Sequence, residues 1–156
     1  MATAITLAQY LTNQGAEYDV RAHAPTVSSM RTAEACHVSA ECLAKAVVLK
    51  DETGYLMAVL PASHNLRLED IEMQLNRSVR LAFEEEIERL FPDCVRGAVP
   101  PVGAAYGLAT IVDDAIIDNF DVYFEGGDHA TLVHMSGADF DRLMADAHHG
   151  RFSAHV

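Results

Sequence analysis

Lys45 is the first residue in the chain whose type and setting could support chemistry. It lies near the start of a short apolar segment, Leu-Ala-Lys-Ala-Val-Val-Leu-Lys, over residues 43–50. This run of aliphatic residues predicts a buried strand. Side chains alternate along a strand, so Lys45 points to the same side as Val47 and Leu49. A cation among apolar side chains is costly unless it is paired or reaches water. Two interpretations follow: Lys45 extends its ammonium to solvent at the strand end, or it points into a ligand cavity.

A second candidate is the loop Gly97–Gly103, with the sequence Gly-Ala-Val-Pro-Pro-Val-Gly. The adjacent prolines stiffen this backbone, and the flanking glycines let it turn and approach a ligand closely. Free N–H groups in such a loop can bind a carbonyl or a developing oxyanion. The alternative is a rigid surface connection. We predict that this loop and Lys45 together line the principal pocket.

His129 follows the Gly126-Gly127 turn and is the third candidate. A histidine can transfer a proton near neutral pH, although a solvent-exposed turn histidine is an equally good interpretation. His129 and His134 do not match the HExxH spacing, and on a strand they would point to opposite sides. Cys36, Cys42 and Cys94 are odd in number and form no CxxC pair, which predicts buried free thiols and neither a disulfide nor a zinc site. We therefore expect no metal and no cofactor.

The elements that must position these residues alternate between short helices and short strands. Helices are predicted over 3–13, 28–37, 66–75, 84–91 and 139–147. Strands are predicted over 17–22, 43–50, 55–60, 78–82, 108–112, 121–124 and 131–135. The pattern predicts an α+β fold, with short helices packed around a central, curved and mostly antiparallel sheet. We expect a single domain over residues 1–150, fraying from His148 onward, and a C-terminal tail over 151–156.

Composition narrows the class of protein. The chain has 156 residues, half of them hydrophobic, and a formal net charge of −12. A protein this acidic repels bulk nucleic acid. Residues 1–50 hold as many basic as acidic residues, so only this third could offer a neutral or basic face to an anion. The chain shows no signal-peptide pattern and no membrane-spanning run, from which we expect a cytoplasmic location and no membrane partner.

Taken in order, several segments resemble a known family. They are His23-x-Pro25, the Lys45 strand, the Gly97–Gly103 loop, Asp121-Val-Tyr-Phe124 with Gly126-Gly127, and Ser136-Gly-Ala-Asp-Phe140. Together they resemble the YbaK/ProX-type aminoacyl-tRNA editing domain, which is also found inserted in bacterial prolyl-tRNA synthetases. The resemblance implies the α+β fold and hydrolysis of the ester that joins a wrong amino acid to its tRNA. It also implies that free-standing members act in trans.

The resemblance assigns roles to particular positions. Lys45 corresponds to the lysine most closely tied to activity, and the loop from Gly97 to Pro101 borders the aminoacyl pocket. The catalytic candidates are Lys45 and His129. The substrate-binding candidates are His23, Gly97, Ala98, Val99, Pro100, Pro101, Gly103, Gly126, Gly127 and Ser136. Ala46 replaces the Thr or Asn that usually follows the lysine, and the residues after the glycine turn differ from the cysteinyl-tRNA-clearing branch. The amino acid removed is therefore left open.

These observations lead to two hypotheses. The first is a metal-independent, trans-acting aminoacyl-tRNA deacylase that binds mischarged tRNA weakly and in a salt-sensitive manner, with affinity supplied by a partner such as an aminoacyl-tRNA synthetase. The second is a non-catalytic module that binds aminoacyl-tRNA or a small ligand. Ala46 favours this second hypothesis, because it replaces a polar residue beside Lys45. A cysteine-dependent hydrolase is a third and remote hypothesis.

Overall fold

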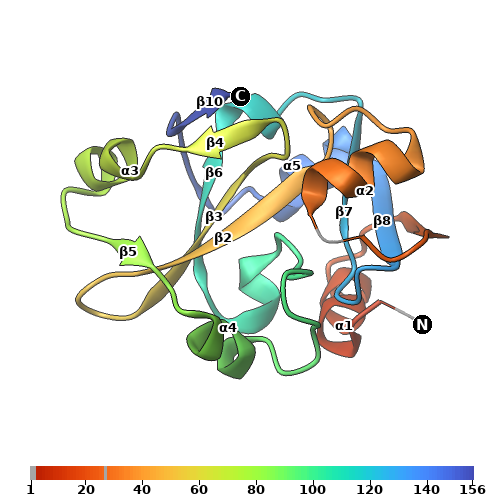
Figure 1. Cartoon of the computed structure of the whole chain (residues 1–156), viewed down its shortest axis with the longest axis horizontal. Coiled ribbons are helices and arrows are strands. Elements are labelled where there is room, and N and C mark those ends of the chain that lie inside the picture. The colour runs from red at the N-terminus through yellow and green to blue at the C-terminus, as the bar shows by residue number, and fades with distance from the viewer. Residues whose placement is uncertain (1–2, 27) are drawn as a thin grey trace.

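The computed structural model describes residues 3–26 and 28–156 and shows short helices arranged around three sheets (Figure 1). The helices are α1 (Ile5–Asn13), α2 (Ser29–Cys36), α3 (Leu68–Leu75), α4 (Glu84–Leu90) and α5 (Gly137–Leu143), with 3-10 helices η1 (Gly103–Tyr106) and η2 (Asp114–Ile116). The strands are β1 (Tyr18–Ala22), β2 (Ala44–Lys50), β3 (Tyr55–Pro61), β4 (His64–Leu66), β5 (Arg80–Leu81), β6 (Ala109–Asp113), β7 (Asp121–Glu125), β8 (Thr131–Ser136), β9 (His148–Gly150) and β10 (Ser153–His155).

The largest sheet has the strand order β5-β2-β3-β6-β9. Strand β2 pairs antiparallel with β3 and β5, whereas β6 pairs in parallel with both β3 and β9. A second sheet, β1-β8-β7, and the short pair β10-β4 are wholly antiparallel. The predicted α+β fold with mostly antiparallel pairing is therefore confirmed, although the strands divide among three sheets.

The β2–β3 hairpin places the predicted lysine strand at the centre of the molecule. Its turn is held by Asp51, whose Oδ1 accepts the backbone N–H groups of Thr53 and Gly54 at 2.8 and 2.9 Å. Both faces of β3 are covered, because Met57 belongs to the main core and Leu56 to a second core beneath α3. Covered faces explain why β3 is a continuous apolar run, with no polar alternation.

The main core lies between the two larger sheets. Val48 and Val112 enter it from the five-stranded sheet, and Val122 and Phe124 enter it from β7. The sheets meet where the N–H of Tyr123 donates to the carbonyl of Cys42, at 2.9 Å. This junction brings the end of β7 toward the start of β2, which is where the lysine lies.

The expectation of fraying from His148 onward is wrong. Strand β9 pairs with β6, and β10 pairs with β4, so the C-terminus lies beside β4 (Figure 1). Phe152 is fully buried, and both its N–H and the hydroxyl of Ser153 donate to Asp113 Oδ2 at 2.8 Å. These contacts join segments about 40 residues or more apart, and no local pattern reveals them.

Candidate active site

A cavity of about 280 Å³ opens beside the first half of β2 and is called the Lys45 cavity below. Its walls come from β2, from β5 and the residues that lead into α4, and from the loop after Arg96. The last residue of β7 and the first residue of α2 complete them. The residues that line it are Ser29, Ala44, Lys45, Ala46, Val47, Val48, Leu81, Ala82, Glu84, Ile87, Gly97, Val99 and Glu125. The lining is mostly small and apolar, with one lysine and two glutamates.

Lys45 occupies the second position of β2 and is half-buried. Its ammonium donates to the carbonyl of Ala62, at 3.4 Å. Burial lowers the pKa of Lys45 below its ordinary value, because desolvation disfavours the charged form. Lys45 thus lines the cavity, and its ammonium is held by the carbonyl of Ala62, which does not line it.

The Gly97–Gly103 loop meets the cavity through its first half only. Gly97 and Val99 line the cavity together with Lys45. Gly97 has a φ of +83°, a conformation that favours glycine, and a Cβ there would lie 3.1 Å from His129 Nε2. The N–H of Ala98 already donates to Val95 O at 3.0 Å, so Gly97 and Val99 carry the loop amides best placed for a ligand.

The rest of this loop lies behind the cavity wall. Ala98, Pro100 and Pro101 are buried and are not among the lining residues. Gly103 begins η1 and lines a different cavity, between α1 and the end of α5. A Cβ at Gly103 would lie 2.5 Å from Thr110 Oγ1, so close packing explains this glycine.

His129 supports the loop and does not line the cavity. Its Nε2 lies 2.6 Å from the carbonyl of Arg96, an obligate acceptor, so Nε2 carries the proton and donates it. His129 itself has a φ of +61°, in the left-handed region. The contact holds the residue before Gly97, and the histidine therefore sets the position of the cavity's loop wall.

The glycine turn and Ser136 do not line the Lys45 cavity, although Gly126 directly follows the lining residue Glu125. Gly126 and Gly127 are buried, and their carbonyls accept the N–H groups of Ala4 and Val95 at 2.8 and 2.7 Å. Ser136 caps α5, where its Oγ accepts the N–H of Asp139 at 3.1 Å. This serine is thus explained by helix capping.

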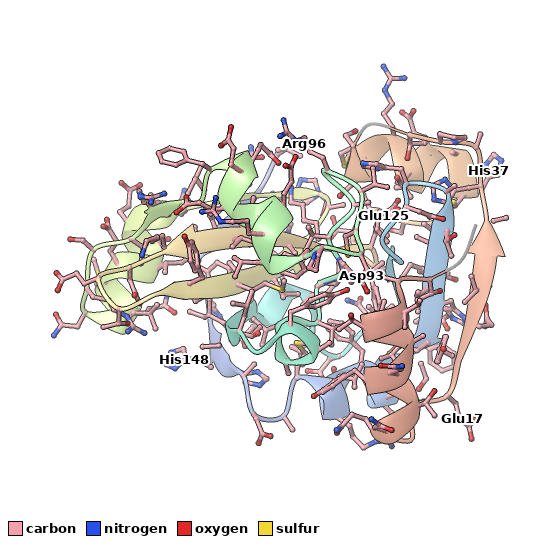
Figure 2. All side chains as sticks on the ribbon, turned by 90° about the horizontal axis from the view of Figure 1, so that it is seen from below. Glu17, His37, Asp93, Arg96, Glu125 and His148 are labelled. Atoms are coloured by element: carbon pink, nitrogen blue, oxygen red, sulfur yellow. The ribbon has the colours of Figure 1, made fainter. Side chains whose placement is uncertain are left out.

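Glu125 is the lining residue that the sequence did not single out. It is 7% exposed and lies at the end of β7, and its Oε1 accepts the hydroxyl of Thr32 at 2.9 Å. The Nε2 of His23, a predicted site residue, lies 3.4 Å from the same oxygen. Figure 2 shows Glu125 in the middle of the molecule, between the Arg96 loop and α2, whereas Glu17, His37 and His148 lie at its edge.

The three thiols lie outside this cavity. Cys36, Cys42 and Cys94 are free and do not line it. Burial raises the pKa of all three, that of Cys94 to about 11, which disfavours the nucleophilic thiolate. In the described part of the chain no three His, Cys, Asp or Glu side chains are grouped closely enough to hold a metal ion. No helix there is long and apolar enough to cross a membrane.

Comparison with known proteins places the chain in a family. The model for the aminoacyl-tRNA editing domain matches residues 23–143, which include Lys45, the Gly97–Gly103 loop and Glu125. The chain belongs to this family. Membership supports a role in aminoacyl-tRNA editing, with aminoacyl-tRNA as the class of substrate. A search of curated proteins found no match.

Solved structures share the fold at low identity. A structure described as "a putative trans-editing enzyme for prolyl tRNA synthetase" has a TM-score of 0.86 and 20% identity, covering 99% of this chain and 98% of its own. The hypothetical protein APE2540 has a TM-score of 0.83 and 21% identity, covering 96% and 99%. A "putative signal transduction protein" from Marinobacter aquaeolei VT8 has a TM-score of 0.80 and 22% identity, and the match spans 96% of this chain and 30% of that one.

Proposed function

We propose that this protein is a trans-acting deacylase that hydrolyses the ester of mischarged tRNA within the Lys45 cavity. The observation that carries the proposal is that the half-buried Lys45 and two loop residues, Gly97 and Val99, line one cavity. Family membership supplies the class of substrate. A solved structure with the same fold is described as a trans-editing enzyme, which supports action in trans.

The chemistry needs charge stabilisation at the ester carbonyl. As water or a ribose hydroxyl attacks, negative charge develops on the carbonyl oxygen. Lys45 and the N–H groups of Gly97 and Val99 would stabilise this charge, since these three residues line the cavity and each carries a donor. Aminoacyl esters are labile already, so holding the ester beside these donors supplies much of the acceleration.

Electrostatics limit how the protein holds tRNA. Of the basic residues in the N-terminal third, Arg21 lies 3.6 Å from Asp19, and Arg31 lies 4.0 Å from Glu34. These acids reduce the charge available for phosphates. We expect weak, salt-sensitive binding by the protein alone, measured by titrating tRNA at several ionic strengths. Tight binding that ignores salt would contradict it, and a synthetase is the partner expected to add affinity.

A non-catalytic binding module is the second candidate. Ala46 lines the cavity beside Lys45 and has no polar group. If a polar side chain at this position is needed for hydrolysis, the cavity would bind an aminoacyl group without cleaving it.

Wild type and Lys45→Ala together separate the two functions. We expect the variant to lower kcat/KM for deacylation by about 100-fold or more, as for loss of an oxyanion donor. Thermal stability should be retained or increased, because a desolvated cation is removed. Lys45→Arg should also fail, because a planar fork does not replace a compact ammonium. The measurement is deacylation of a panel of mischarged tRNAs, with a thermal melt of each variant.

Lys50→Ala is the matched control. Lys50 ends the same strand, and its ammonium lies 4.8 Å from the centre of the Tyr55 ring, outside the cavity lining. This variant should stay within about threefold of wild type, because it removes a charge that lies outside the cavity lining. Near wild-type turnover in Lys45→Ala would remove Lys45 from the mechanism. Absence of deacylation by wild type across the panel would move the assignment to the binding module.

A further inference from the structure

The carboxyl group of Glu125 is incompletely paired although it is buried. Its Oε1 accepts the hydroxyl of Thr32, which in turn lies 2.6 Å from the hydroxyl of Thr26. Its Oε2 is buried and has no hydrogen-bond partner among residues 3–26 and 28–156. Buried polar atoms are almost always hydrogen-bonded, so an unpartnered oxygen on a residue that lines the cavity points to a ligand that supplies the donor.

His23 does not supply that donor. Its Nδ1 lies 2.8 Å from the carbonyl of Ala24, an obligate acceptor, so Nδ1 carries a proton. Its other ring nitrogen, Nε2, faces Glu125 Oε1 at 3.4 Å and has no hydrogen-bond partner among the described residues. This contact is made to Oε1 of Glu125, so within the same part of the chain Oε2 stays without a hydrogen-bond partner. Burial also raises the pKa of Glu125 above its ordinary value, which is the cost that a cationic ligand would offset.

The Lys45 cavity thus presents one cation and two carboxylates within apolar walls. Glu84 is exposed and lies 3.7 Å from Arg96, which leaves Glu125 as the buried carboxylate. Lys45 attracts a carbonyl oxygen and repels a cation, and Glu125 does the reverse. An aminoacyl ester carries the matching pair of groups, a carbonyl and an α-ammonium one carbon apart. The lining residues Ala44, Val48 and Ile87 are apolar and suit a small side chain.

We propose that Glu125 is the receptor for the α-ammonium group of the substrate. The inference rests on the proposed function and names its substrate class: esters of α-amino acids whose amine is free. An N-acylated aminoacyl group lacks the positive charge and presents an amide to the carboxylate. Peptidyl-tRNA is such a substrate, and the cavity would therefore spare it.

The test uses binding, so that it does not depend on hydrolysis. The probes are adenosines whose 3′-amino group carries glycine, alanine, serine or proline through a stable amide. Each is made with a free, an N-methylated and an N-acetylated amine. The N-methyl probe adds bulk and keeps the charge, whereas the N-acetyl probe adds bulk and removes it. Affinities are measured by calorimetry on wild type, Glu125→Gln and Glu85→Gln.

We expect wild type to bind the free-amine form of at least one probe about 10-fold or more tighter than its N-acetyl form, as for a charge-assisted hydrogen bond. The N-methyl form of the same probe should bind nearly as well as the free amine. Glu125→Gln should reduce the preference to below about threefold. Glu85→Gln should retain it, because Glu85 is exposed on α4 and does not line the cavity.

Several outcomes would overturn the inference. They are equal affinity of wild type for charged and acetylated probes, equal losses for methyl and acetyl probes, an undiminished preference in Glu125→Gln, or no binding of any charged probe. The wild-type comparison needs no variant and stands even if Glu125→Gln folds poorly. If binding depends on the amine but no deacylation is found, the proposed deacylase function fails and the role of Glu125 stands. If deacylation is found but binding shows no amine preference, the deacylase function stands and the role of Glu125 fails.

Discussion

Two buried glutamates, of which Glu125 lines the Lys45 cavity and Glu86 does not, have opposite electrostatic settings. Glu86 is 9% exposed and Glu125 is 7% exposed, so burial is nearly equal. Arg80 donates to both oxygens of Glu86, and Tyr55 and the N–H of Phe83 donate as well. The hydrogen bonds from Arg80 and then Tyr55 lower the pKa of Glu86 to about 2. Glu125 has one hydroxyl donor, and burial raises its pKa.

The difference teaches that burial alone does not indicate the role of an acid. Glu86 has its donors supplied by the fold, and it ties β5 and the start of α4 to β3. It is a structural residue, since no part of its carboxylate is left for a ligand. Glu125 lines the cavity and has an oxygen without a donor in the described chain, and such a group costs stability until something binds it.

The largest expected effect is on stability. Glu86→Gln should lower the thermal midpoint by about 4 °C or more, because the amide places a donor against Arg80 and cannot serve all three partners. Glu125→Gln should leave the midpoint unchanged or raise it, since a desolvated charge is lost. Thermal melts near neutral pH measure both. Equal losses in the two variants would remove the distinction.

The second expected effect is on the pH dependence of stability. The folded pKa of Glu86 is about 2, below its ordinary 4.5, so its contribution is complete above 4.5 and is lost as pH falls toward 2. The folded pKa of Glu125 is raised above 4.5. The folded state then keeps a proton that the unfolded chain releases, and stability declines as pH rises through that folded pKa.

Melts across this range should therefore diverge in opposite directions. The deficit of Glu86→Gln relative to wild type should shrink on acidification. The advantage of Glu125→Gln should appear only as pH rises above 4.5, the ordinary pKa of the group. A Glu125→Gln advantage that is constant across pH would mean that the charge of Glu125 is not responsible.

The smallest expected effect comes from Thr32→Val. This variant removes the hydroxyl donor to Glu125 and keeps the side-chain shape, at a cost of about 1 kcal/mol. It should also raise the pKa of Glu125 further, because the hydrogen bond from Thr32 lowers it. NMR titration of the Glu125 side chain in both proteins measures the shift. An unchanged pKa would show that Thr32 does not tune this carboxyl.

Local pattern was enough to predict most of the fold. The β2–β3 hairpin was evident from two apolar runs around Asp51, and the five α-helices from their caps and apolar spacing. Three-residue strands were missed, because β4, β9 and β10 exist only through pairing with distant segments. For the same reason the helix expected from Leu66 begins at Leu68: Leu66 belongs to β4.

The site could be predicted in part. Lys45 was evident as a cation in an apolar strand, and Gly97 as a glycine beside stiff backbone, and both line the cavity. Glu125 was missed because it is one acid among 23 in a chain that is acidic throughout. Its position at the end of an apolar strand and directly before Gly126 was the available signal. Only the tertiary structure shows that Thr32 and His23 lie beside it.

The contact between Asp113 and the last strand sets an order of events during synthesis. Asp113 is 3% exposed, and its Oδ2 receives its donors from Phe152 and Ser153. On the ribosome these donors emerge about 40 residues after Asp113 itself. Until then Asp113 Oδ2 lacks these two donors, and Phe152 has not yet covered its part of the second core. The domain therefore completes its fold only after the segment with Phe152 and Ser153 has left the exit tunnel. Before that point the uncovered part of this core is accessible to chaperones.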